Sequence, residues 1–168
     1  PTTSTTAQLV MGDALAVCLL NLRGFTSKDF AKFHPGGSLG KTLYLQVKDI
    51  IDQNPKPQVA LDTAMKEVII EISQKRLGAT AVIDCSRIVG IITDGDIRRM
   101  LESNADFNQL SAKDIMSSNP KTISENDLAV DALEVLEQNN ITQIIAIDDK
   151  HQYAGVVHLH DLIKEGIL

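Results

Sequence analysis

Two side chains suited to binding a sugar or a phosphate stand at a predicted strand-to-helix junction. Thr93 and Asp96 follow the apolar run from Val89 to Ile92 and precede an amphipathic stretch that ends at Leu101. A threonine at the N-cap with a carboxylate three residues later forms a capping box, here with Asp in the place of Glu. At a helix N-terminus the hydroxyl can also donate to a phosphate, and the carboxylate can accept from a ribose diol. The spacing therefore predicts a helix cap with a candidate ligand site built on it.

A second junction has the same pattern with different chemistry. The eight residues that begin at Gly90 recur 65 positions later, so that Asp161 matches Asp96 while His158 replaces Thr93. An imidazole is bulkier than a hydroxyl and titrates near neutral pH, so it suits a carboxylate or a phosphate more than a snug diol. We therefore expect two unequal half-sites, of which the first carries ribose recognition.

Cations and further histidines lie near both junctions. Arg98, together with the neighbouring Arg99, could neutralise a ligand phosphate, although exposed helical arginines are as often simply solvated. His158 and His160 would share one face of a strand, but no cysteine or third fixed ligand accompanies them, so they fit a polar rim of a cleft better than a metal site. We predict no metal and no cofactor. The predicted effector-binding residues are Thr93, Asp96, Arg98, His158, His160 and Asp161.

The repetition extends beyond the two junctions. Three more pairs of segments are also 65 residues apart, which indicates a duplicated unit that aligns without a gap. They are Lys48–Ile50 with Lys113–Ile115, Asp62–Ala64 with Asp127–Ala129, and Ala81–Asp84 with Ala146–Asp149. A unit of this length exceeds a solenoid repeat, so we expect two copies packed as one domain.

Hydrophobic periodicity and turn residues predict the order strand, helix, strand, strand, helix in each copy. The predicted strands cover 59–61, 79–83, 87–92, 121–123, 143–147 and 153–157, and the predicted helices cover 62–76, 94–101, 127–140 and 160–165. Each copy would leave one face of its sheet uncovered, so the two should pack together. The predicted fold class is α+β, with two β-α-β-β-α repeats.

The first 41 residues have a different character. A helix predicted over 7–23 and ended by Gly24 has apolar side chains on all sides, which is typical of a helix buried in a larger body. Its most apolar run, 9–22, is interrupted by Asp13 and is predicted to be too short to span a bilayer. A capping-box pattern from Thr26 to Asp29 predicts a second, short helix.

His34 opens a loop, predicted over 34–41, that contains three glycines and one proline. Composition alone favours a linker turn. The alternative is an active-site loop that presents the imidazole to a substrate, with glycines that allow a close backbone approach.

Composition limits the partners. The 168 residues carry a net charge of −6, whereas nucleic-acid binding requires a basic surface. Residues 1–41 carry +2 and the remainder −8, so an anionic ligand would need a local basic patch. Cys18 and Cys85 indicate free thiols and a reducing cytoplasm. The chain begins at Pro1 without a signal sequence and reads as a piece of a longer protein.

The duplicated unit, with its glycine, two apolar residues, threonine and aspartate at the last junction, resembles a CBS-domain pair. Such pairs commonly bind adenosine nucleotides or related effectors in the cleft between copies, and form flat dimers. The first 41 residues resemble the end of the sugar isomerase (SIS) domain of bacterial D-arabinose 5-phosphate isomerases, in which a CBS pair follows. The segments that carry this second resemblance are Pro1–Thr6, Gly12–Ala16, His34–Lys41 and His158–Leu162.

The resemblance implies an end of a SIS domain over 1–41, a first CBS repeat over 42–106 and a second over 107–168. It also implies that His34 is a catalytic-site histidine of the intact parent, which would interconvert D-ribulose 5-phosphate and D-arabinose 5-phosphate for Kdo and lipopolysaccharide synthesis. Isomerisation needs a base and usually an acid for ring opening, and the rest of the SIS domain is absent from these residues. We therefore expect this chain to be inactive alone.

Two functions remain open. In the first, the CBS pair is a regulatory module that binds a nucleotide-type effector, either an adenosine nucleotide or a cytidine nucleotide of Kdo acting as feedback inhibitor. In the second, it is a structural pair that supports a dimer or tetramer and binds no ligand. A third, weaker hypothesis is a CBS accessory domain of a transporter or dehydrogenase, which the resemblance of residues 1–41 to a SIS domain disfavours. No contact with nucleic acid or a membrane is expected.

Overall fold

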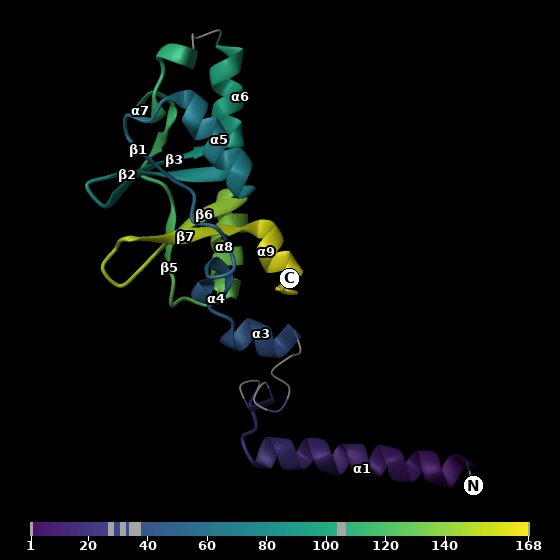
Figure 1. Ribbon diagram of the computed structural model, residues 1–168. Coiled ribbons are helices and arrows are strands. Elements are labelled where there is room, and N and C mark those ends of the chain that lie inside the picture. The colour runs from purple at the N-terminus through teal and green to yellow at the C-terminus, as the bar shows by residue number, and fades with distance from the viewer. Residues whose placement is uncertain (1, 27–28, 31–32, 34–37, 104–106, 168) are drawn as a thin grey trace. The chain divides into compact units, whose positions relative to one another are not determined.

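The computed structural model describes residues 2–26, 29–30, 33, 38–103 and 107–167. The chain divides into two compact units, 1–43 and 44–168 (Figure 1). The first unit contains α1 (Thr2–Leu22) and most of α3 (Ser38–Tyr44).

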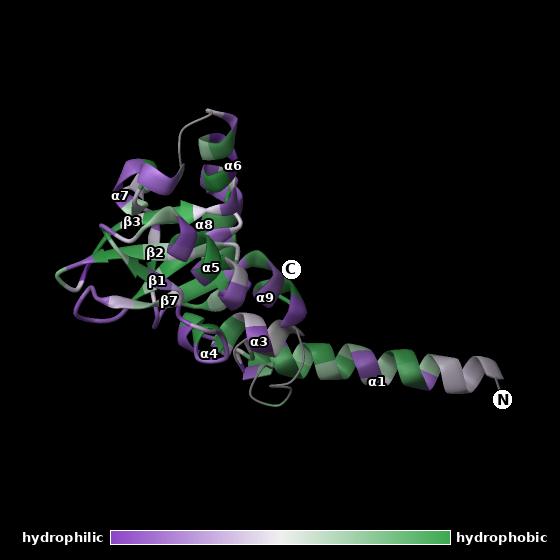
Figure 2. Ribbon diagram, turned by 45° about the horizontal axis from the view of Figure 1, so that its top comes forward, coloured by the Kyte–Doolittle hydropathy of each residue, from purple (hydrophilic) through white to green (hydrophobic). Residues whose placement is uncertain are grey.

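Helix α1 has apolar residues on all sides, as predicted (Figure 2). Among the described residues, none of its side chains is buried. It begins at Thr2 and has 21 residues, so by length and composition alone it could cross a bilayer, as could many core helices of soluble proteins. The apolar run 9–22 thus lies within a longer helix than the one predicted over 7–23. Gly24 ends the helix as predicted, with a φ of +60°.

In the segment after α1, the predicted capping box is correct and part of the predicted loop is not. The capping box is confirmed, because the Thr26 N–H donates to the Asp29 carboxylate at 3.0 Å and the Asp29 N–H to the Thr26 hydroxyl at 3.3 Å. The predicted loop over 34–41 is wrong from Ser38 onward, where α3 begins. Three of the seven residues of α3 are leucine or lysine, good helix formers that outweigh its single glycine. His34 lies outside the described residues.

The second unit confirms the predicted order strand, helix, strand, strand, helix in both copies, and adds a short helix at the start of each copy and a short strand in the second copy that were not predicted. The first copy consists of α4 (Val47–Ile51), β1 (Gln58–Ala60), α5 (Met65–Lys75), β2 (Ala79–Asp84), β3 (Arg87–Thr93) and α6 (Asp94–Glu102). A 3-10 turn, η1 (Phe107–Gln109), leads to the second copy, which consists of α7 (Ala112–Ile115), β4 (Ser117–Ser118), β5 (Thr122–Ser124), α8 (Ala129–Asn139), β6 (Gln143–Ile147), β7 (Tyr153–His158) and α9 (Leu159–Lys164).

The strands form two sheets, in the orders β1-β2-β3-β4 and β5-β6-β7. In each sheet the first pair is parallel and the following pairs are antiparallel. Strand β4 therefore takes the chain of the second copy onto the edge of the first copy's sheet. This pairing brings residues from both copies to the end of β3.

Two details of the sequence interpretation are wrong. Helices α5 and α8 begin two or three residues later than predicted, because the residues before them stay extended in β-bridges, Ala64 with Ser111 and Leu128 with Gln46. The spacing between copies is 65 residues from α4 to α7 but 64 from β1 to β5, from α5 to α8 and from β2 to β6. The prediction that the two copies align at a single spacing without a gap is therefore wrong for the middle of the repeat, from its first parallel strand to its second.

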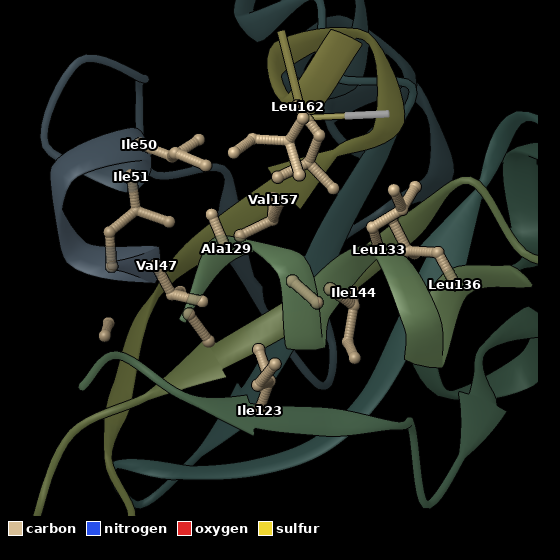
Figure 3. Packing of buried hydrophobic residues seen from close by; sticks show 14 residues of the cluster. Val47, Ile50, Ile51, Ile123, Ala129, Leu133, Leu136, Ile144, Val157 and Leu162 are labelled. Atoms are coloured by element: carbon tan, nitrogen blue, oxygen red, sulfur yellow. The ribbon is translucent and has the colours of Figure 1, made fainter. Parts of the chain in front are cut away.

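The first short helix of each copy packs into the core of the other copy. Helix α4 contributes three buried residues to the core built by the second copy (Figure 3), and α7 contributes Ala112 to the core of the first. Matching backbone bonds hold the two helices in place: the Val47 N–H donates to the Asp127 carbonyl and the Ala112 N–H to the Thr63 carbonyl, both at 2.9 Å. The two copies are therefore interlocked.

Two glycines at corresponding positions of the two copies leave space for the exchanged segments, which are α4 with its neighbours and α7 with the Met116 that follows it. A Cβ on Gly155 of β7 would lie 2.9 Å from Cβ of Ile51, and a Cβ on Gly90 of β3 would lie 2.6 Å from Sδ of Met116. Both distances are shorter than any ordinary contact between such atoms. The glycines of the repeated junction motif thus allow each exchanged segment to approach the sheet.

Candidate functional site

The predicted capping box at the start of α6 is present. The Thr93 N–H donates to Asp96 Oδ2 at 2.8 Å, and the Thr93 hydroxyl donates to the same oxygen at 2.6 Å. The Asp96 N–H in turn donates to the Thr93 hydroxyl oxygen at 3.3 Å. The hydroxyl proton, which the sequence interpretation assigned to a ligand phosphate, is therefore already used within the cap.

The other oxygen of Asp96 faces two more donors. Nη2 of Arg99 lies 2.6 Å from Oδ1, and the Ser117 hydroxyl lies 3.2 Å from it. The side chain of Asp96 is only 7% exposed, whereas that of Arg99 is 69% exposed. Burial on its own would raise the pKa of Asp96, but the hydrogen bonds from Thr93 and the guanidinium of Arg99 outweigh it and hold this pKa below the ordinary value. Asp96 is therefore a charged acceptor at neutral pH.

A cleft of about 450 Å³ opens beside these residues, between the two copies. The first copy provides the end of β3 and the first turns of α6, and the second copy provides residues 117–121 and 140–143. The charged side chains of the lining are Asp96, Arg99 and Lys121, so the lining has a net positive charge in a strongly acidic chain. Its volume falls within the usual range for small-molecule sites, roughly 300–1,000 Å³.

The second junction is more closed. The amide of Asn54 donates to Asp161 Oδ2 at 2.8 Å, and the hollow beside this pair has a volume of only about 90 Å³. Its lining is Ile50, Gln53, Asn54, Asp161, Lys164 and Glu165. The two junctions thus differ in geometry as well as in sequence.

His158 serves as the N-cap of α9. Its Nδ1 accepts a hydrogen bond from the His160 N–H at 3.0 Å, and the two rings stack with their centroids 5.0 Å apart. Burial first, and then the neighbouring His160, lower the pKa of His158 despite the opposing carboxylates of Asp161 and Asp94. A neutral imidazole that accepts at Nδ1 carries its proton on Nε2, so His158 offers one donor at neutral pH and no positive charge.

The structure groups most of the residues that the sequence singled out. Thr93 and Asp96 line the cleft, and His158 and His160 lie together at the start of α9. Arg98 is exposed and lies outside the cleft lining, whereas Arg99, one position later, lies within it. Among the described parts of the chain, no group of three or more His, Cys, Asp or Glu side chains could hold a metal ion.

Sequence reasoning missed several lining residues. Arg99 could have been preferred over Arg98, because a residue three positions after Asp96 shares its helix face and a residue two positions after it does not. Asn54 and Asn119 each precede a proline and are 65 residues apart, a repetition in the sequence that could have pointed to them. In the structure, Asn54 bonds Asp161 and Asn119 lines the cleft.

Comparison with protein families gives a match over both copies. The model of the family described as CBS domain matches residues 47–103 and 112–167. A CBS domain protein from Pyrobaculum aerophilum, solved in complex with AMP, superposes with a TM-score of 0.65 at 21% identity, over 70% of this chain and 90% of that one. The predicted fold, a CBS-domain pair, is confirmed.

Curated relatives extend the similarity to the whole chain. Two of them, from Yersinia pestis and Escherichia coli (strain K12), are both named arabinose 5-phosphate isomerase KdsD and are 46% and 43% identical over 170 residues. Each alignment covers 100% of this chain and 52% of the relative. The similarity to arabinose 5-phosphate isomerases is thus confirmed, over about half the length of these relatives.

Proposed function

This chain belongs to the CBS domain family, and from that premise we propose that residues 44–168 are the regulatory module of a sugar-phosphate isomerase and bind a nucleotide-type effector. The cleft beside Asp96 carries the proposal. It combines a buried, ionised acceptor with two cations in a volume suited to a small molecule. The similarity of the whole chain to arabinose 5-phosphate isomerases supports the assignment of the parent enzyme.

In the proposed complex, the ribose diol donates to Asp96 and the phosphate lies near Arg99 and Lys121. Arg99 takes the role that the sequence interpretation gave to Arg98, because Arg99 lines the cleft. The second half-site, with His158, His160 and Asp161, receives the remaining part of a longer effector. Its ligand groups would be the Nε2–H donor of His158 and the carboxylate of Asp161.

Two classes of effector fit this chemistry. An adenosine nucleotide is supported by the Pyrobaculum aerophilum protein, whose structure was solved with AMP. A cytidine nucleotide of Kdo, acting as feedback inhibitor, has a nucleoside at one end and a carboxylate at the other, which matches the two unequal half-sites. Both classes carry a ribose and an anionic group.

The proposal extends to the parent protein. Residues 1–41 would be the end of a SIS domain, in which His34 takes part in the interconversion of D-ribulose 5-phosphate and D-arabinose 5-phosphate for Kdo synthesis. Two free, exposed cysteines support a cytoplasmic location. One histidine cannot act as both base and acid, so the 168-residue chain should not convert ribulose 5-phosphate in an isomerase assay.

Thermal shift and calorimetric titration with AMP, ADP, ATP, CMP and the cytidine nucleotide of Kdo test effector binding. A ligand that binds only the folded state must raise the melting temperature. We expect such a shift for at least one nucleotide, and its loss in Asp96→Asn. The matched control is Asp62→Asn, which changes an exposed carboxylate outside the cleft and should keep the shift. An equal shift in Asp96→Asn would contradict the proposed site, and no shift with any nucleotide would contradict effector binding.

The second candidate function is structural support of an oligomer without a ligand. Ile70 of α5, Leu101 of α6 and Ile163 of α9 are 44%, 58% and 41% exposed, which favours self-association through these helices. Sedimentation with and without nucleotides separates the two functions. A stable dimer or tetramer that binds none of the nucleotides would favour the structural role.

A further inference from the structure

The carboxylate of Asp96 has no acceptor site left for a ligand as the structure stands. Thr93 donates twice to Oδ2, and Arg99 and Ser117 each donate to Oδ1. A carboxylate offers about four acceptor positions, and four donors already occupy them. A ribose diol can therefore bind Asp96 only if one of these donors leaves.

Arg99 is the donor that can leave at least cost. The two bonds from Thr93 hold the N-terminus of α6, and their loss would open the helix cap. The side chain of Arg99 is 69% exposed, so its guanidinium can turn toward the cleft without disturbing the core. The residue belongs to the last turn of α6, but its Nη1 lies 3.5 Å from the position that a Cβ on Gly95 would take, so the guanidinium reaches back to the first turn, where the helix dipole disfavours a cation.

We infer that Arg99 makes the cleft selective for ligands that carry an anionic group next to their ribose, an inference that rests on the proposed function and refines it. A phosphate recruits the guanidinium of Arg99, and this movement frees Asp96 Oδ1 for the diol. The ion pair between Arg99 and Asp96 is thus exchanged for an ion pair between Arg99 and the phosphate. A nucleoside lacks the phosphate, so it must break the pair between Arg99 and Asp96 with no replacement.

The charges of the lining favour this exchange. With Arg99 released from Asp96, the phosphate meets two cations, Arg99 and Lys121, both on the cleft. Arginine binds phosphate through two parallel N–H bonds, which compensates for its bond to the carboxylate. Asp96 then keeps Thr93 and Ser117 as partners and gains the diol.

Calorimetric titration with AMP and adenosine, and with CMP and cytidine, tests the inference on the wild type, Arg99→Gln and Arg98→Gln. In the wild type, the nucleotide that binds should bind at least about tenfold more tightly than its nucleoside, because a charge-assisted hydrogen bond contributes about that much affinity. In Arg99→Gln this ratio should fall to about threefold or less, because the nucleoside gains affinity and the nucleotide loses it. Arg98→Gln removes the same charge one residue away, outside the cleft lining, and should leave the ratio unchanged.

The outcomes separate this inference from the proposed function. Nucleoside binding that appears or strengthens only in Arg99→Gln supports the inference. Equal affinities of nucleotide and nucleoside in the wild type overturn the inference. A ratio of the two affinities that stays the same in Arg99→Gln overturns it as well. Either result leaves effector binding in place. Absence of binding by all four ligands to all three proteins, together with no thermal shift for ADP, ATP or the cytidine nucleotide of Kdo, overturns the proposed function itself. Because Arg99 is mostly exposed, Arg99→Gln should melt within a few degrees of the wild type.

Discussion

At Asp96, burial and hydrogen bonding act on one carboxylate in opposite directions, and the pKa of Asp96 settles below the ordinary value of 3.8. A carboxyl group whose pKa is lowered by folding stabilises the protein above its unfolded pKa, and this contribution is lost as the pH falls through the folded pKa. We therefore expect Asp96→Asn to lower the free energy of unfolding by about 1–3 kcal/mol at pH 7, the usual effect of losing a buried charged hydrogen bond.

Urea denaturation over a series of pH values measures this effect. The difference between the wild type and Asp96→Asn should remain constant down to the ordinary pKa of an aspartate and shrink only below it. Asp62→Asn, at an exposed position, should show no comparable difference. A difference between Asp96→Asn and the wild type that already shrinks near neutral pH would contradict the assignment.

Thr80 differs from Asp96 in that its buried polar group makes no hydrogen bond among the described residues. It lies on β2 opposite Ile92, is fully buried, and has no hydrogen-bond partner for its hydroxyl among the described residues. Thr80→Val keeps the shape and removes the unpaired hydroxyl, so the free energy of unfolding should rise by about 1 kcal/mol in urea denaturation. The hydroxyl of Thr63 accepts from the Ala60 N–H at 3.0 Å, so the control exchange Thr63→Val, which removes this bond, should lower stability. A loss of stability in Thr80→Val would indicate a partner for its hydroxyl.

The separation of residues in the sequence decides how much of the site was predictable. The bonds between Thr93 and Asp96 span three residues, so the capping rule was sufficient to predict them. The bond from Ser117 to Asp96 spans 21 residues and that from Asn54 to Asp161 spans 107. Such contacts depend on how the copies pack, and no local rule of spacing contains that information.

At the scale of elements, hydrophobic periodicity was sufficient to predict the type and order of the strand, helix, strand, strand and helix of each copy, but not the short elements α4, α7 and β4. The starts of α5 and α8 could not be predicted in this way. A local propensity places the start of a helix at Asp62, but the bridge between Ala64 and Ser111 holds the chain extended for two more residues. Tertiary pairing between the copies therefore overrides the local signal.

The matched glycines of β3 and β7 allow a prediction at this scale. In Gly155→Ala the new Cβ would press on Cβ of Ile51, an atom fixed to the backbone of α4. In Gly90→Ala the two nearest atoms, Sδ and Cγ of Met116, belong to a flexible side chain that can move away, and the backbone-fixed Cβ of Met116 lies slightly farther off, at 3.0 Å. We expect Gly155→Ala to lower the free energy of unfolding by about 1–3 kcal/mol and Gly90→Ala by less, in urea denaturation.

Gly95→Ala is the control for this pair, since its Cβ would meet only ordinary contacts at 3.4 Å and beyond. Alanine is the better helix former, so this variant should be as stable as the wild type or more so. Equal losses in Gly155→Ala and Gly90→Ala would contradict the proposed difference between the exchanged segments.

At the scale of the whole chain, both hydrophobic cores lie within residues 44–168. A protein made of these residues alone should therefore fold and show one cooperative unfolding transition by circular dichroism. Its melting temperature should lie close to that of the same transition in the full chain. A broad, non-cooperative transition would show that the second unit depends on the first.

Self-association is the second expectation at this scale. Helix α1 exposes large apolar side chains, among them Leu9 and Leu22 at 72% and 83%. The full chain should therefore associate at tens of micromolar in light scattering, roughly where a micromolar contact is populated. Residues 44–168 keep Ile70, Leu101 and Ile163 and should form dimers without larger species. A strict monomer in both proteins would contradict this expectation.

The exchange of α4 and α7 bears on how a chain of this kind can arise. A single copy of the repeat would carry a short apolar helix for which it has no groove, since α4 fits only the second copy and α7 only the first. Such a copy could fold only with a twin that received its helix and gave one in return, as a symmetric homodimer. In a homodimer every substitution falls on both sites at once. With both copies in one chain that constraint is absent, so position 93 can hold threonine while position 158 holds histidine.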